Sequence, residues 1–233
     1  MWTSPTLLHH MLTLSTLFCY HFPVPATHSY HHGNLRQALL KAAIALIREV
    51  GPQGFTLREV ARRAGVSHNA PYRHFKNRDE LLAEVAAEGF ERLTKFMEES
   101  ASRGASPLER FQLSGRGYIR FALQFPEHFA VMFDEPSVLP ASAHCKEAAA
   151  RAFAALLGFV SDSQQAGALP TGDPQMFALM AWSVVHGVAK LAVSGHLPFT
   201  SQSDVLEFGA SLTNALGLGI VQAAGSVSPE QIQ

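Results

Sequence analysis

Apolar residues recur three or four positions apart along most of this chain, which is the spacing of one buried face on an α-helix. The first clear face comprises Leu35, Ala38, Leu39, Ala42, Ala43, Leu46, Ile47 and Val50. Asn34 can cap the start of this helix, and Gly51 with Pro52 ends it, because proline cannot continue the hydrogen-bond ladder. The pattern therefore predicts a helix from Asn34 to Val50.

Two more helices follow almost without linkers. Thr56 and Glu59 have the spacing of a capping box, and the helix that they begin ends at a glycine. Ser67 can cap a third helix of about two turns, in which Pro71 is harmless only within the first turn. Asn77 begins the next helix. Helices joined so tightly must cross steeply, so the segment predicts a helix-turn-helix whose short third helix fits a DNA major groove.

Charges are unevenly divided along the chain. Residues 31–80 hold nine Lys and Arg against four acids, a net charge of +5, whereas the remaining residues hold nine against fifteen, a net charge of −6. Lys and Arg neutralise phosphates and supply most of the sequence-independent affinity for DNA. A basic head on an acidic body is therefore expected for a nucleic-acid module, although from charge alone a solvated basic face is an equal alternative.

The segment Gly54–Leu82 resembles the DNA-binding domain of the TetR family of bacterial transcriptional regulators. Its Thr56 cap, the Ala64–Ser67 turn and the Tyr72-Arg-His-Phe75 signature occur in the family's order and spacing, and the preceding Tyr30–Leu39 resembles the start of one subgroup. The resemblance implies phosphate contacts from Thr56, Tyr72, Lys76 and Arg78. It implies contacts at or near base edges from Arg58, Ser67, His68, Asn69, Ala70, Arg73 and His74.

The chemistry of these side chains agrees in part with those roles. Arg58 and Arg62 lie one turn apart on one helix face, and a guanidinium can bind guanine through two hydrogen bonds. Asn69 can pair with adenine, whereas Ala70 offers only a methyl group to thymine. Arg62 and Arg63 have an alternative, because they can be solvated or paired with an acid on their own helix instead of touching DNA.

Beyond residue 80 the spacing stays helical, without the alternation of a β-strand. Helices are expected at 78–100, 107–125, 127–133, 142–166, 175–194 and 203–224, with a loop at 134–140. The predicted fold is all-α, with a three-helix DNA-binding domain at 31–79 and a helical effector-binding and dimerisation domain at 80–225. We expect residues 1–30 to be disordered or an extension upstream of the true start, because no Lys or Arg of a secretory signal precedes Arg36, and residues 226–233 to be a disordered tail.

The helices expected at 175–194 and 203–224 are apolar nearly all round, so they need cover on more than one side. This favours a homodimer in which the two helices and their twins form a four-helix bundle. The run Trp182-x-x-x-His186-Gly187, with Phe125–Phe133 before it, is similar to the C-terminal domain of the TetR subgroup named for a Trp-His-Gly motif.

Aromatic and sulfur-containing residues of the body suggest a ligand cavity with a histidine as its polar anchor. The candidate ligand-binding residues are Tyr118, Phe121, Phe125, His128, Met132, Phe133, Trp182 and His186. The alternative is an ordinary core, in which the same rings pack together and His186 is hydrogen-bonded inside it.

Other chemistry is not indicated. Only two of the 233 residues are Cys, with no Cys-x-x-Cys pair, and no phosphate-binding glycine loop or catalytic motif occurs. We therefore expect no enzyme activity, no cofactor and no metal, and no membrane span in the interrupted apolar stretch at 7–22. The expected function is that of a cytoplasmic repressor, bound as a homodimer to double-stranded operator DNA and released by a small hydrophobic effector. An architectural DNA-binding protein without an effector, or a helical enzyme or carrier, is the alternative.

Overall fold

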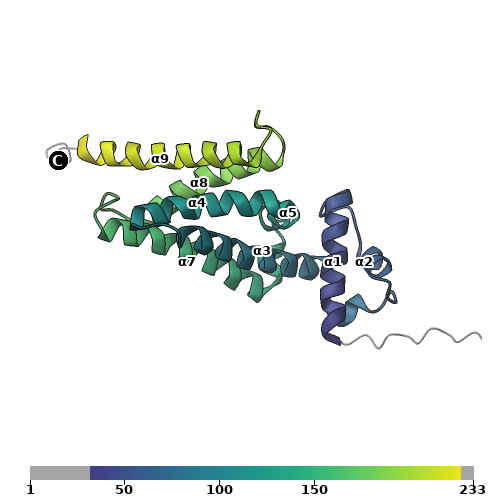
Figure 1. Cartoon of the computed structure of the whole chain (residues 1–233). Coiled ribbons are helices and arrows are strands. Elements are labelled where there is room, and N and C mark those ends of the chain that lie inside the picture. Colours follow the sequence, from purple (N-terminus) through teal and green to yellow (C-terminus); the bar gives the residue numbers. More distant parts are fainter. Residues whose placement is uncertain (1–31, 227–233) are drawn as a thin grey trace, which may run out of the picture.

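A computed structural model describes residues 32–226, and the side chains of residues 35–215 among them. In Figure 1 a small head at one end of the molecule is followed by an elongated helical body. The head contains α1 (His32–Val50), α2 (Leu57–Arg63) and the 3-10 helix η1 (Pro71–Arg73). The body contains α3 (Arg78–Ala101), α4 (Pro107–Gln124), α5 (Pro126–Asp134), α6 (Val138–Ala141), α7 (Ala143–Gln165), α8 (Pro174–Val193) and α9 (Gln202–Ser226). Residues 32–226 contain no strand, which confirms the predicted all-α class.

Local capping fixes the starts of α2 and α3. The Thr56 hydroxyl accepts a hydrogen bond from the Glu59 N–H, while the Glu59 carboxylate accepts one from the Thr56 N–H, so the predicted capping box is confirmed. Asn77 caps α3 through its side chain, also as predicted. The predicted start of α1 at Asn34 is wrong, because the helix begins earlier, at His32, a difference typical of helix ends.

The third helix of the head is shorter than predicted. In place of an α-helix of about two turns, the chain forms a turn after Ser67 and a 3-10 helix over Pro71–Arg73. The cause is Pro71, because an α-helix would need its missing N–H to bond the Ser67 carbonyl oxygen. The Ala70 N–H bonds that oxygen instead, at 2.9 Å.

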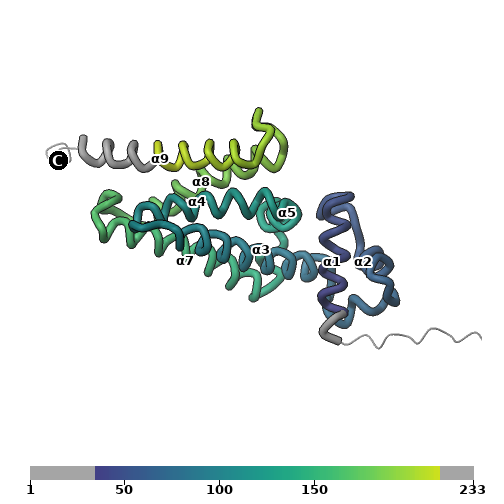
Figure 2. Tube along the Cα trace, viewed as in Figure 1, coloured from purple at the N-terminus to yellow at the C-terminus, as the bar shows by residue number. Residues whose placement is uncertain are grey.

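The body is layered around α3 and α4. α3 packs on α4 and α7, and α8 and α9 both pack on α4 (Figure 1). One hydrophobic cluster runs from Phe75 in the head through Leu82 in α3 to Phe121 and Phe129 in the body, and all four side chains are fully buried. Figure 2 shows the chain passing from the head directly into α3. The head and the body therefore share one core, and α3 crosses the boundary predicted at residue 80.

Residues 134–140 were expected to form a loop, and this expectation is wrong because they include the start of the short helix α6. Val138 of α6 is fully buried, and the helix packs against α3 and α7. So short a helix is not stable alone, and tertiary contacts hold it. The predicted extension at 1–30 and residues 227–233 of the predicted tail lie outside the described residues.

Candidate DNA-binding face and effector cavity

The turn between α2 and α3 presents polar side chains to solvent. His68, Asn69 and Arg73 are exposed, and the Tyr72 side chain is 51% exposed. Phe75, at the end of the turn, is 1% exposed and anchors it to the core. In Figure 1, α2 lies on the side of α1 away from most of the body. The turn therefore forms an accessible surface on the head.

Two of the predicted DNA contacts are placed differently from the others. Ala70 is 7% exposed, so its methyl group packs into the head and is not presented to a base edge. The Thr56 hydroxyl and backbone N–H both donate to Glu59 Oε2, at 2.9 and 2.7 Å. A phosphate oxygen would need one of these donors, and the capping box uses both. The remaining residues predicted to contact DNA are exposed or partly exposed: Arg58, Ser67, His74, Lys76 and Arg78.

Ion pairs divide the basic residues of the head into two groups. The engaged pairs are Arg36 with Glu84 on α3, Arg48 with Glu127 on α5, and Arg63 with Glu49 on α1. Arg78 lies 3.7 Å from Asp79, too far for a hydrogen bond, so its guanidinium keeps its donors for another partner. Among residues 35–215, no carboxylate lies within 4.0 Å of the side-chain nitrogens of Lys41, Arg58, Arg62, Arg73 or Lys76. Positive charge on α2 and the exposed turn is therefore available to a nucleic acid, whereas the arginines that face the body are neutralised.

The pair between Arg48 and Glu127 ties the head to the body. Arg48 Nε donates to Glu127 Oε1 at 2.5 Å, and Glu127 is only 9% exposed. Burial acts to raise the pKa of the Glu127 carboxyl, but hydrogen bonds from Arg48 and from the backbone outweigh burial and hold the pKa below its ordinary value. Glu127 therefore stays ionised, and it offers a fixed negative charge to the head.

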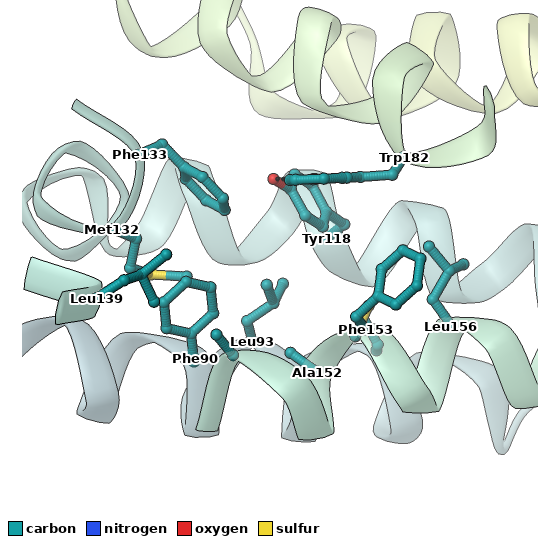
Figure 3. Close-up of a pocket in the computed structure, with 12 residues that line it drawn as sticks. Phe90, Leu93, Tyr118, Met132, Phe133, Leu139, Ala152, Phe153, Leu156 and Trp182 are labelled. Atoms are coloured by element: carbon teal, nitrogen blue, oxygen red, sulfur yellow. Dashed lines mark hydrogen bonds between the residues drawn. The ribbon is translucent and has the colours of Figure 1, made fainter. Parts of the chain in front are cut away.

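A cavity of about 240 Å³ lies inside the body between α3, α4, α5, α6, α7 and α8 (Figure 3). Four of the eight predicted ligand residues line it, namely Tyr118, Met132, Phe133 and Trp182. The wall also contains residues that were not predicted: Phe90, Leu93, Met97, Leu139, Ala149, Ala152, Phe153 and Leu156. On α3 and on α7 these residues recur three or four positions apart, so the sequence pattern indicates that each set lies on one face of its helix. It did not indicate that the two faces oppose one another across a space.

The other four predicted ligand residues lie away from the cavity wall. Phe121 is fully buried and stacks on Phe125, with 5.8 Å between the ring centroids, as in an ordinary core. His128 is 3% exposed, and among the described side chains neither of its ring nitrogens has a hydrogen-bond partner. Burial lowers the pKa of His128, so its imidazole is neutral. His186 stands behind the wall and reaches a residue that lines it.

A hydrogen-bonded group joins α4 to α8 at the edge of the cavity. The Trp182 Nε1–H donates to the Tyr118 hydroxyl at 3.2 Å, and His186 Nδ1 lies 2.8 Å from the same oxygen. Burial raises the pKa of Tyr118 far above its ordinary value and lowers the pKa of His186, so both groups are neutral at about pH 7. Figure 3 shows the hydroxyl beside Trp182, with Phe133 on its other side.

One face of α8 carries apolar side chains that are exposed in a single chain. They are Met176, Leu179, Met180 and Leu191. Within the described residues, α8 is also the one helix that is long and apolar enough to cross a membrane by length and composition alone. It packs on α4, α7 and α9, as a core helix does. Exposed apolar side chains gathered on one face are typical of interaction surfaces.

Comparison with known proteins places these features in a family. Residues 39–85 match the family described as bacterial regulatory proteins, tetR family, and residues 111–215 match the tetracyclin repressor-like C-terminal domain. The chain belongs to the TetR family. In this TetR-family chain the first match includes α2 and the exposed turn. The second match includes the Trp182–Gly187 motif and most of the cavity wall.

Curated relatives match the TetR-family chain over short stretches. The tetracycline repressor protein class C of Escherichia coli is 43% identical over 51 residues, which are 22% of this chain and 23% of that protein. An HTH-type transcriptional repressor of Mycobacterium tuberculosis is 34% identical over 64 residues, which are 28% of this chain and 34% of that protein. The chain thus spans 23% and 34% of the length of these two relatives.

Solved structures cover most of the TetR-family chain. A protein with unknown function from a Rhodococcus species is 34% identical, with a TM-score of 0.72, over 83% of this chain and 98% of that one. The TetR family transcriptional regulator PfmR from Thermus thermophilus is 17% identical, with a TM-score of 0.61, over 77% of this chain and 97% of that one. At this identity the likeness to PfmR shows a common fold.

Proposed function

We propose that this TetR-family chain is a cytoplasmic transcriptional repressor that binds operator DNA as a homodimer and is released by a small apolar ligand. One observation carries the proposal. Arg58, Arg62, Arg73 and Lys76 lie on α2 and the exposed turn, without a carboxylate partner among residues 35–215. Cations in this state can neutralise phosphates and release their counterions. The repressor names of the curated relatives support the same function.

The exposed turn and α2 supply the groups that distinguish one base from another. Asparagine pairs with adenine through N6 and N7, and arginine forks onto guanine O6 and N7. We assign base contacts to Arg58, Ser67, His68, Asn69, Arg73 and His74. We assign phosphate contacts, which orient the head on the duplex, to Tyr72, Lys76 and Arg78.

The apolar face of α8 supports a homodimer interface that α8 and α9 form with their twins. Burial of methionine and leucine side chains between two copies would remove this face from water, which is the main source of stability in an obligate interface. A two-fold axis at this bundle would present two reading turns to one face of the DNA. They must lie about 34–36 Å apart to enter successive major grooves.

Two helices connect the cavity to the head. α3 carries three residues of the cavity wall and begins beside the head. α5 carries Met132 and Phe133 on the wall and, near its start, Glu127, which pairs with Arg48 of α1. A ligand that moves either helix would reorient the head, so ligand and operator affinities would be coupled reciprocally.

Selection from a random DNA pool tests the DNA-binding part of the proposal. The full chain should enrich pseudo-palindromic sequences whose half-sites lie about one helical turn apart. The double variant Arg58→Ala with Asn69→Ala should fold normally and lose the enrichment, because both side chains are exposed. Recovery of no common sequence by the wild-type chain would contradict sequence-specific binding.

A thermal-shift screen of small apolar compounds tests the effector part. A compound that occupies the cavity raises the melting temperature because it binds only the folded state. The same compound should weaken operator binding. If no compound stabilises the chain, the result favours the alternative, a DNA-binding protein without an effector.

A further inference from the structure

The Trp-His-Gly run has a specific task in this fold, because its two ring side chains meet on one hydroxyl. Trp182 and His186 stand one turn apart on α8, and both reach Tyr118 Oη on α4, at 3.2 and 2.8 Å. Tyr118 is 3% exposed and lines the cavity, and its hydroxyl lies at the cavity edge in Figure 3. Trp182 and His186 therefore fix the position of this hydroxyl, a polar group beside an otherwise apolar space.

The hydrogen-bonding capacity of Tyr118 Oη is not exhausted by these two partners. A phenol oxygen offers one donor and two acceptor sites, and the Trp182 indole N–H can only donate, so it takes one acceptor site. If His186 Nδ1 accepts the phenol proton, one acceptor site is left for a ligand. If His186 Nδ1 donates instead, the phenol proton is left. A ligand hydroxyl suits both arrangements, because it donates and accepts.

The cavity offers nothing that would stabilise a charged ligand. Its wall includes no Lys, Arg, Asp or Glu among the residues that line it. The nearby ion pair of Lys190 with Asp134, in contact at 2.6 Å through Oδ2, is satisfied within itself. Placing an ionised group in such a space without a partner is strongly unfavourable.

The size of the cavity limits the ligand from both sides. Its volume of about 240 Å³ exceeds the cavity of ~150 Å³ that holds benzene, and it is below the ~300–1,000 Å³ typical of drug-sized ligands. One aromatic ring with a short alkyl chain fits between these limits. The aromatic side chains on the wall, such as Phe90, Phe133 and Phe153, can pack around a ring of that size.

We propose that the cavity binds an uncharged, single-ring or similarly compact apolar molecule whose one hydroxyl group is hydrogen-bonded to Tyr118, with Trp182 and His186 as positioning residues. This inference rests on the proposed function, because it names the chemical class of the effector. It gives the motif on α8 a chemical role that packing alone would not require.

Calorimetric titration of the full chain without DNA tests the inference with three probes of one shape. Para-propylphenol carries the hydroxyl, propylbenzene lacks it, and para-propylbenzoate carries a charge. On the wild-type chain para-propylphenol should bind about fivefold more tightly than propylbenzene. Para-propylbenzoate should bind at least about tenfold more weakly than para-propylphenol. The inference is overturned if the benzoate binds best, if the two neutral probes bind equally, or if none of the three binds.

Two variants locate the binding event. Tyr118→Phe removes only the hydroxyl, so the advantage of the phenol over propylbenzene should fall below about twofold. An advantage that is unchanged or larger overturns the role of Tyr118. Ala152→Leu narrows the cavity from α7 and should weaken both neutral probes about tenfold, whereas the matched Ala154→Leu, at an exposed position of α7, should not. The ranking of probes on the wild-type chain decides the inference even if Tyr118→Phe does not fold.

DNA retardation separates a failure of this inference from a failure of the proposed function. If the apo chain binds its selected DNA but the phenol does not bind the cavity, the chain is a DNA-binding regulator with a ligand of other chemistry. If the phenol binds with the expected ranking but the chain retards no DNA, the ligand class stands and the repressor function falls.

Discussion

The outer face of the head is made by one continuous stretch, residues 56–78, whereas the cavity wall collects side chains between Phe90 and Trp182 from six helices. In the head, helix caps and one tight turn place exposed polar groups that are close in sequence. In the body, no short segment makes the site, because the residues that line the space come from helices far apart in the sequence. A DNA-reading surface is therefore visible in a short motif, and a ligand cavity is visible only in the assembled fold.

Arginines also join the head to the body. Arg36 and Arg48 belong to the basic head by sequence, yet both bind carboxylates of the body. Arg58 and Arg73, on the outer face, have no carboxylate partner among residues 35–215. Net charge per segment thus overstates the charge offered to DNA, and pairing in the structure corrects it.

The largest expected effect contrasts two aromatic residues of the same turn. Phe75→Ala should destabilise the protein by ~3–5 kcal/mol, because the ring is fully buried in the core shared by head and body. Tyr72→Ala should change stability by only ~0.5 kcal/mol, since its ring is half exposed. Urea unfolding at one protein concentration measures both. Equal losses of stability in the two variants would contradict the assignment of Phe75 to the core and of Tyr72 to the exposed surface.

The next effect separates base reading from phosphate contact. Arg58→Ala should lose on the order of 1–3 kcal/mol on operator DNA and relax the choice of base. Arg78→Ala should weaken operator and random DNA alike and flatten the dependence of affinity on salt. Binding titrations on both DNAs at several salt concentrations make the comparison.

Arg63→Ala is the matched control for the arginines of α2. Its guanidinium binds Glu49 at 2.7 Å and is therefore engaged inside the head. Its loss should affect DNA affinity less than the loss of Arg58. If Arg58→Ala weakens operator and random DNA by the same factor, Arg58 does not read a base.

Much of the head could be predicted because its signals act over three or four residues. The capping box of Thr56 with Glu59, the Asn77 cap and the helix end at Gly51 all occur where the sequence places them, and Gly51 takes a left-handed conformation there. The length of the third helix was missed because Pro71 lies one position too deep for an α-helix that starts at Ser67.

The body could be predicted as helices but not as a site. Phe121 and Phe125 are aromatic, like Phe133, yet Phe121 is buried in the core and Phe125 packs against it, partly buried. Nothing in their local sequence separates them from a residue of the cavity wall. The contact of Arg48 with Glu127 joins residues far apart in the chain, and it depends on how α5 meets α1. Such pairings need the tertiary structure.

A smaller effect concerns how the two regions communicate. Glu127→Gln removes the charge that binds Arg48 while keeping the shape of the side chain. We expect the factor by which a cavity ligand weakens operator binding to fall about twofold to tenfold. Operator titration with and without a compound that stabilises the chain measures this factor. Glu88→Gln, whose partner Arg92 lies on the same helix, is the control and should leave the factor unchanged. If the ligand weakens operator binding by the same factor in Glu127→Gln as in the wild type, the coupling between cavity and head does not pass through Glu127 and is left to α3.

The smallest expected effect is a dependence of stability on pH at His144, which lies on the body side of the same joint. Hydrogen bonds with Glu91, at 3.0 Å, and with Glu84, at 3.3 Å, raise the pKa of His144 above its ordinary value. A histidine whose pKa is raised by folding stabilises the protein fully below the pKa of the unfolded chain, about 6.5, and loses that contribution as the pH rises through the folded pKa.

Because His144 is exposed and its pairs are screened by solvent, the contribution should be under ~1 kcal/mol. The difference in free energy of unfolding between wild type and His144→Gln should therefore be largest below the ordinary pKa of histidine, about 6.5, and should decline as the pH rises through the raised pKa of the folded state. Taking this difference cancels the titration of the other histidines. A difference that grows as the pH rises would mean that His144 is held neutral in the fold.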